Sequence, residues 1–129
     1  MASSYLLDTN TVIAAIGMEI DLDRRRRGGD EIYLSVPSLG ELFFGAEKSQ
    51  RVQENFFQIQ RLTATFPVIS CDQDTARHYG VLRNLLRKKG RPIPVNDLWI
   101  AASARQHGLT LVTRDGHFDY LEGITLEKW

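Results

Sequence analysis

Apolar residues form two patterns that follow one another in turn along this chain. One is typical of buried strands and the other of amphipathic helices. The strand pattern consists of short apolar runs rich in β-branched and aromatic residues, at 5–7, 32–36, 67–71, 109–113 and 124–126. The helical pattern consists of apolar residues recurring every three or four positions, at 11–16, 37–46, 51–66, 72–89 and 98–106. The last of these helices is apolar almost all round, which predicts that it is buried against a sheet.

Polar and glycine residues mark where these elements begin and end. Side chains that cap helix N-termini precede or open four of the helices: Thr9 or Asn10, Ser38, Asp72 or Asp74, and Asn96. Three helices are followed by a glycine, at Gly17, Gly90 and Gly108. The prolines in 91–94 predict an extended linker. Residues 17–30 are polar and contain glycines, which predicts a loop or a short helix.

Strands that alternate with helices predict an α/β fold with a mainly parallel central sheet of four to five strands flanked by helices. We find no internal repeat and no low-complexity tract, so residues 1–129 are expected to form one domain. In such sheets, ligands bind beyond the carboxyl ends of the strands. Two acidic residues, Asp8 and Asp115, fall at that edge.

The composition indicates the expected cellular compartment of the protein but does not decide its function. Lys plus Arg and Asp plus Glu both number 16, so the net charge gives no argument for a nucleic-acid partner. The single cysteine, Cys71, rules out an internal disulfide and fits a reducing cytosol, and it is expected to be a small core residue. There is no leader-like N-terminus and no apolar run long enough to cross a membrane, so a cytoplasmic protein is expected.

Four acidic residues interrupt or border stretches that should be core: Asp8, Glu41, Asp97 and Asp115. A buried carboxylate is costly unless it is paired or binds a metal. Each of them alone is also explained as a helix cap or a solvated side chain, because caps are common. Together, in the order of an α/β fold, they indicate one shared cation site.

Oxygen ligands of this kind suit Mg²⁺ or Mn²⁺, which activate water and neutralise charge in phosphoryl chemistry. Two other classes compete with this reading. A catalytically inactive α/β binding module has no reason to keep four such acids. A phosphoacceptor domain of the response-regulator type would need a lysine near the acids, whereas Arg114 follows the strand at 109–113.

The segments around these acids resemble the signature blocks of PIN-domain ribonucleases, and most closely the VapC-like toxins of type II toxin–antitoxin pairs. The blocks are LLDTN at 6–10, PSLGELFFGA at 37–46, PVNDLWIAA at 94–102 and LTLVTRD at 109–115. Their order and spacing extend the resemblance over nearly the whole chain, from residue 5 to 129. DNA- or flap-cutting nucleases usually carry extra elements that this chain lacks.

The resemblance implies a PIN-like fold and an endoribonuclease that depends on Mg²⁺ or Mn²⁺. It places catalytic duty on Asp8, Glu41, Asp97 and Asp115, with the metal held by Asp8, Asp97 and Asp115. It also implies an RNA substrate, a cognate antitoxin and a homodimer. A PIN nuclease without an antitoxin remains the alternative. The arginine-rich segment 18–30 departs from the family, and Asp119 competes with Asp115, which we prefer because it follows the strand directly.

Hydroxyl and amide groups beside the acids are candidates for orienting them: Thr9, Asn10 and Thr113. Simple capping is the favoured interpretation for Asn10 and for Asn96. His117 is a candidate for contacting RNA or a leaving group, although a lone loop histidine is more often simply solvated. His78 and His107 are expected on helix surfaces.

Basic and aromatic residues outside the acidic set suggest partner surfaces. A run without acids, from Arg77 to Arg91, includes four candidates for RNA backbone contacts: Arg87, Lys88, Lys89 and Arg91. Complementing a helix dipole is an equally good explanation of these charges. The arginines at 24–27 are candidates for RNA or for an acidic antitoxin tail. Adjacent aromatics point to opposite sides of a helix, so one member of Phe43-Phe44 and one of Phe56-Phe57 is expected to face a partner or the core.

Overall fold

Five strands form one sheet in the order β3-β2-β1-β4-β5, and every neighbouring pair runs parallel. The computed structural model describes residues 3–129, so the expectation of no leader lies partly outside it. The strands are β1 (Ser4–Leu7), β2 (Glu31–Ser35), β3 (Val68–Ile69), β4 (Thr110–Val112) and β5 (Leu126–Glu127). The expected α/β architecture with a parallel sheet is therefore confirmed.

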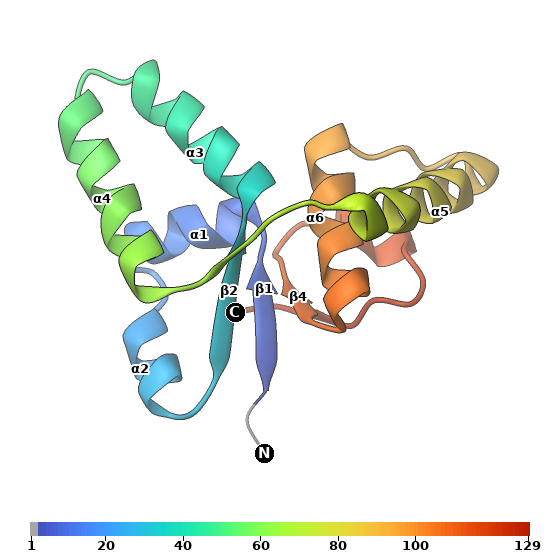
Figure 1. The fold of residues 1–129 in the computed structure, drawn as a ribbon, viewed down its shortest axis with the longest axis horizontal. Coiled ribbons are helices and arrows are strands. Elements are labelled where there is room, and N and C mark those ends of the chain that lie inside the picture. Colours follow the sequence, from blue (N-terminus) through green and yellow to red (C-terminus); the bar gives the residue numbers. More distant parts are fainter. Residues whose placement is uncertain (1–2) are drawn as a thin grey trace.

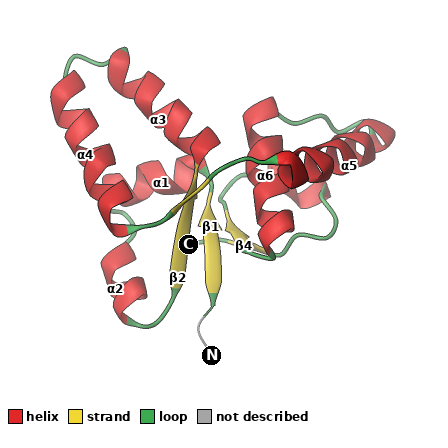
Figure 2. Ribbon diagram, in the orientation of Figure 1, coloured by secondary structure: helices red, strands yellow, loops and turns green. Residues whose placement is uncertain are grey.

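Helices cover both faces of this sheet (Figures 1 and 2). One layer contains α1 (Thr9–Ile16), α2 (Leu22–Arg27), α3 (Val36–Glu47) and α4 (Val52–Thr65). The other contains α5 (Gln73–Lys89) and α6 (Val95–His107), and a short 3₁₀ helix, η1 (Gly116–Tyr120), follows β4. In the described part of the chain, every helix is too short or too polar to cross a membrane.

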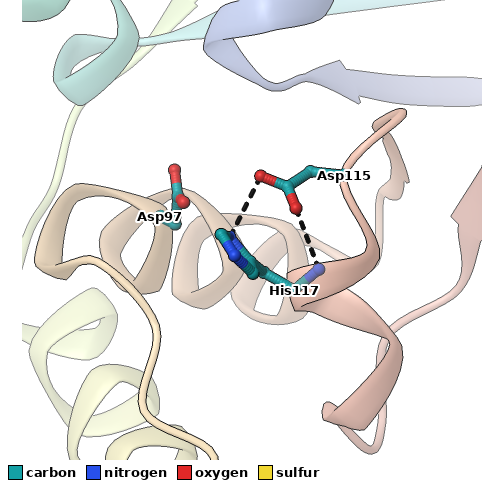
Figure 3. Close-up of side chains that lie close together, drawn as sticks. All are labelled: Asp97, Asp115 and His117. Atoms are coloured by element: carbon teal, nitrogen blue, oxygen red, sulfur yellow. Dashed lines mark hydrogen bonds and ion pairs between the residues drawn. The ribbon is translucent and has the colours of Figure 1, made fainter.

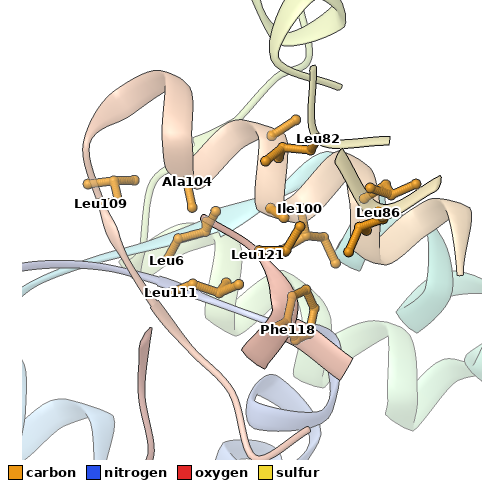
Figure 4. Packing of buried hydrophobic residues seen from close by; sticks show 12 residues of the cluster. Leu6, Leu82, Leu86, Ile100, Ala104, Leu109, Leu111, Phe118 and Leu121 are labelled. Atoms are coloured by element: carbon orange, nitrogen blue, oxygen red, sulfur yellow. The ribbon is translucent and has the colours of Figure 1, made fainter. Parts of the chain in front are cut away.

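The two faces of the sheet carry separate hydrophobic clusters. Side chains alternate along a strand, so Leu6 packs with α5 and α6 while Tyr5 and Leu7 pack with the other layer. Figure 4 shows the first cluster, in which the fully buried Phe118 anchors η1 near Leu111. The central strand is buried on both faces, as expected for a parallel sheet covered by helices.

The helix beginnings differ from the sequence prediction at three places. Asp8, rather than Thr9 or Asn10, caps α1, because its Oδ1 accepts the Thr11 backbone N–H at 2.8 Å. Ser35 caps α3 in place of Ser38. The predicted cap Asn96 lies inside α6, which begins after Pro94 without a side-chain cap. The cap of α5 at Asp72 is confirmed and forms a capping box with Thr75.

Cys71 corrects the expectation of a small core residue, because it is exposed. β3 ends at Ile69, two residues earlier than the predicted strand, so Cys71 lies in the loop that leads into α5. Its Sγ lies 4.0 Å from the hydroxyl oxygen of Ser103, and partial burial raises the pKa of the Cys71 thiol. Cys71 is not among the residues that line the acidic pocket described below.

Candidate active site

The four predicted acids line one open pocket of about 460 Å³ at the carboxyl edge of the sheet. Asp8 follows β1, and Asp115 lies beyond the end of β4. Glu41 comes from α3 and Asp97 from the first turn of α6, so both helical layers contribute. The pocket is also lined by Thr9, Asn10, Pro94, Val95 and Asn96. The sequence prediction that these acids share a site agrees with this arrangement.

Asp8 is a buried carboxylate held at both oxygens. Its Oδ1 accepts the Thr11 N–H, and its Oδ2 accepts the Thr113 hydroxyl at 2.5 Å. Only 3% of the residue is exposed. Hydrogen bonds to the charged form of a carboxylate compensate for its burial, so Asp8 is fixed in position before any ligand binds.

Glu41 is held from two directions at a single oxygen. The hydroxyl of Thr9 and the amide of Asn96 both donate to its Oε1, at 3.2 Å and 3.3 Å. The Thr9 hydroxyl oxygen also lies 3.2 Å from the Ser38 hydroxyl oxygen, which belongs to a short chain of buried hydroxyls. The Thr9 bond links Glu41 to α1 in its own layer, whereas the Asn96 bond links it to α6 in the opposite layer.

Asp97 is the most perturbed acid of the set. Burial and, to a smaller extent, the negative charges of Glu41, Asp115 and Asp8 together raise its pKa to about 6. Among the hydrogen bonds within residues 3–129, none engages the Asp97 carboxylate. A half-buried carboxylate that lacks such partners and faces three others is relieved by a cation.

Asp115 lies beside a histidine that the sequence analysis had treated as a solvated loop residue. Its Oδ1 accepts the His117 backbone N–H at 2.9 Å, and its Oδ2 lies 3.1 Å from the His117 Nδ1 (Figure 3). One ligand atom from each of Asp97, Asp115 and His117 lies within 4.8 Å of the others. The residues therefore fit a divalent cation, with oxygen donors from several elements and one nitrogen at the rim.

The remaining candidates differ in how they relate to the pocket. Thr9 and Thr113 bond directly to acids of the site, as expected for orienting groups. Asn10 is exposed, lines the pocket and lies within α1, whose cap is Asp8, so the capping interpretation of Asn10 is wrong. Asp119 is exposed and lies in a neighbouring hollow that excludes Asp8, Glu41 and Asp97. The position of Asp115 in the main pocket agrees with the preference for it over Asp119.

The basic candidates lie at and after the end of α5, and none of them lines the acidic pocket itself. Arg87 bonds to Asn84 within the helix, and Lys89 pairs with Glu122 at 2.9 Å. Arg91 lies over the Tyr120 ring, 4.5 Å from its centroid. Lys88 is exposed. Three of the four predicted RNA contacts thus also make contacts within the chain.

Sequence reasoning missed two groups of the site, His117 and Asn96. Asn96 directly precedes an acid at a predicted helix start, and this favoured the capping interpretation. It donates to Glu41 instead because α6 begins at Val95, one turn earlier than predicted. The spacing of His117, two residues after Asp115, was the only available signal for its role.

In this chain a parallel α/β sheet brings four carboxylates together in one pocket at its carboxyl edge. The chain belongs to the PIN domain family, whose model matches residues 5–124. It is 33% identical to ribonuclease VapC2 of Haemophilus influenzae, with 97% of each chain covered. It is 34% identical to the tRNA(fMet)-specific endonuclease VapC of Shigella flexneri, also with 97% of each covered.

Solved structures give the same result. VapBC2 from Rickettsia felis, bound to a DNA fragment from its promoter, has a chain with a TM-score of 0.89 and 30% identity, covering 98% of both chains. DNA-bound VapBC from Salmonella typhimurium has a chain with a TM-score of 0.89 and 32% identity, covering 100% of this chain and 99% of that one. The resemblance to VapC-like PIN proteins noted from the sequence is confirmed.

Proposed function

We propose that this chain is a Mg²⁺- or Mn²⁺-dependent endoribonuclease and the toxin of a toxin–antitoxin pair. The observation that carries the proposal is the single pocket lined by Asp8, Glu41, Asp97 and Asp115. The similarity to ribonucleases of the VapC type supports RNA as the substrate. The VapBC complexes among the similar structures support an antitoxin partner.

In the proposed mechanism, Asp8, Asp97 and Asp115 would hold the cation. A cation bound there would supply a lowered pKa for a bound water and neutralise charge on the phosphate. Thr11 and Thr113 keep Asp8 in place, so its carboxylate does not have to reorganise. Glu41 is held at Oε1, which leaves Oε2 to accept a proton from the attacking water. Water adds across one phosphodiester bond, and the departing oxygen takes up a proton.

The substrate surface is proposed to extend from the pocket to the basic residues at the end of α5. Arg91 and His117 line one hollow, so the basic linker and the acidic site meet there. RNA backbone binding is dominated by phosphate charge, and Arg87, Lys88, Lys89 and Arg91 provide the positive counterpart. The tRNA(fMet) specificity named for similar enzymes makes a structured RNA the first substrate to test.

The antitoxin is proposed to bind the α3–α4 layer. Phe43 and Phe56 pack edge to face with ring centroids 5.7 Å apart, while Phe44 and Phe57 are 65% and 59% exposed. One member of each adjacent pair is thus free to contact an amphipathic helix. A basic side chain of the antitoxin would reach Asp8 and Asp97 and neutralise the pocket. The active unit is proposed to be a homodimer, which light scattering after size exclusion tests.

The decisive experiment is Asp8→Asn. The amide oxygen keeps the bond from the Thr11 N–H, so the fold should persist and gain stability as repulsion between carboxylates is relieved. We expect cleavage of a tRNA pool to be lost in this variant and in wild-type protein treated with EDTA. Asp119→Asn, which changes an acid outside the pocket, is the matched control and should cut at the wild-type rate.

Three results would contradict parts of this proposal. Wild-type cleavage by Asp8→Asn would remove Asp8 from the site. Loss of activity in Asp119→Asn would make Asp119 the fourth acid. If the chain is harmless when overproduced and co-purifies with no neighbouring gene product, the toxin assignment fails and a PIN nuclease without an antitoxin remains.

A further inference from the structure

His117 extends the acidic site with a different kind of donor. One of its ring nitrogens and one oxygen from each of Asp97 and Asp115 lie within 4.8 Å of one another. Figure 3 shows the imidazole between the two carboxylates, which come from α6 and from the turn after β4. The side chain is 56% exposed, so its outer edge meets solvent while its inner edge faces the acids.

The backbone places this imidazole independently of any ligand. Asp115 caps η1 by accepting the His117 N–H, which fixes the first residues of the turn. The next residue, Phe118, is fully buried in the core formed with α5 and α6 (Figure 4). Lys89 donates to the Tyr120 carbonyl at 2.8 Å and ties the far end of η1 to α5. Because both ends of η1 are held, His117 stays beside the pocket.

Its chemistry differs from that of the four acids. Mg²⁺ strongly prefers oxygen ligands, whereas Mn²⁺ and later transition metals also accept imidazole nitrogen. On the basis of the proposed metal-dependent function, we propose that His117 supplies a nitrogen ligand beside Asp97 and Asp115, and that this ligand makes the site prefer Mn²⁺ over Mg²⁺.

A positioning role for His117 is the main competing explanation. The 3.1 Å contact from its Nδ1 to Oδ2 of Asp115 would then merely orient that carboxylate. Loss of an orienting group reduces the affinity for every ion that binds Asp115 by a similar factor. Loss of a nitrogen ligand would instead weaken the binding of Mn²⁺ more than that of Mg²⁺, so the ratio of the two affinities separates the explanations.

The test uses the purified chain, MnCl₂ and MgCl₂, and the variants His117→Ala and His107→Ala. His107 is exposed on the last turn of α6 and serves as a matched histidine control. Calorimetry measures both affinities, and electron spin echo modulation of bound Mn²⁺ detects a directly coordinated ¹⁴N. In wild type and His107→Ala we expect nitrogen modulation and tighter binding of Mn²⁺ than of Mg²⁺.

In His117→Ala we expect the nitrogen modulation to disappear. The Mn²⁺ affinity should fall about tenfold while the Mg²⁺ affinity stays within about twofold, as expected for the loss of one nitrogen donor. Bound Mn²⁺ without nitrogen modulation in wild type, or an equal fall for both ions, overturns this inference and leaves the proposed nuclease intact. Failure of wild type to bind either ion overturns both.

Discussion

The hydroxyl of Thr113 donates a 2.5 Å hydrogen bond to Oδ2 of Asp8. The two residues directly follow the paired strands β4 and β1. The same hydroxyl oxygen accepts the Asp115 backbone N–H at 3.0 Å. One side chain thus fixes two acids of the pocket at once. This link is possible because a threonine hydroxyl can donate one hydrogen bond and accept another at the same time.

Replacing Thr113 with Val should therefore damage the site more than the fold. The variant leaves a buried carboxylate oxygen without its donor, which costs about 1.5–3 kcal/mol of unfolding free energy. RNA cleavage should fall about 10- to 100-fold as Asp8 and Asp115 lose their common support. Urea unfolding and initial cleavage rates measure the two effects.

Thr110→Val, made in the same strand, is the matched control for Thr113→Val. Thr110 lies two residues before the strand ends and outside the acidic pocket. It should keep wild-type cleavage. If Thr113→Val also cuts at the wild-type rate, Thr113 does not orient the acids.

The raised pKa of Asp97 predicts how the stability of the metal-free protein depends on pH. The folded-state pKa is about 6, above the ordinary value of 3.8, so the folded protein binds this proton more tightly than the unfolded chain. The stabilisation is fully present below 3.8 and is lost as pH rises through about 6. Unfolding in EDTA between pH 4 and pH 8 should show this decline.

Asp97→Asn supplies the comparison for the Asp97 prediction, because an amide does not titrate. The difference in unfolding free energy between wild type and Asp97→Asn should grow in favour of the variant as pH rises. Saturating Mn²⁺ should reverse the order above pH 6, since only wild type keeps the ligand. Parallel pH curves for the two proteins would show that Asp97 titrates normally.

Two adjacent lysines should respond differently to alanine substitution. Lys88 is exposed, whereas Lys89 is paired with Glu122 and the Tyr120 carbonyl. Lys88→Ala should weaken RNA binding and reduce the salt slope of log K by about 0.7, the value for one phosphate contact on a single strand. Lys89→Ala should mainly loosen η1 and reduce cleavage.

Fluorescence anisotropy with a labelled RNA at several salt concentrations separates the effects of the two lysine variants. An unchanged salt slope in Lys88→Ala would assign the basic end of α5 to the helix dipole rather than to substrate.

The exposed aromatics of the α3–α4 layer should matter for the antitoxin and not for stability. Phe44→Ser and Phe57→Ser remove exposed rings, so the unfolding free energy should stay within about 0.5 kcal/mol of wild type. Affinity for the antitoxin should fall at least tenfold, as is typical of aromatic anchors in an interface. Val81→Ser on the exposed side of α5 is the control, and an equal loss in that variant would place the antitoxin elsewhere.

Much of the fold was predictable because elements buried in a parallel α/β core are recognisable as apolar segments of the sequence. The strand at Leu6 and the helix around Ile100 are apolar enough to be recognised without any other information. Strand ends were less predictable, since β3 pairs over only two residues and its predicted extension to Cys71 is exposed. Short edge pairing depends on tertiary contacts that a local pattern does not contain.

The acids of the pocket were predictable for a different reason. A carboxylate beside an apolar run, such as Asp97, is recognisable in the sequence because burying its charge requires a partner or a metal. His117 and Asn96 create no such conflict, because both lie at polar positions of the chain. Their roles follow only from the turn of η1 and from the register of α6 against α3, which the sequence pattern does not reveal.

The order in which the pocket is assembled has a consequence for protein synthesis. Asp8 and Glu41 belong to the first third of the chain, whereas Asp97 and Asp115 belong to the last, and β4 pairs with β1 across about a hundred residues. A ribosome making this protein releases the two halves of the pocket at different times. A nascent chain therefore holds an incomplete set of acids until β4 has emerged and docked. The RNA of the translating ribosome therefore does not meet the complete set of acids before β4 has left the ribosome.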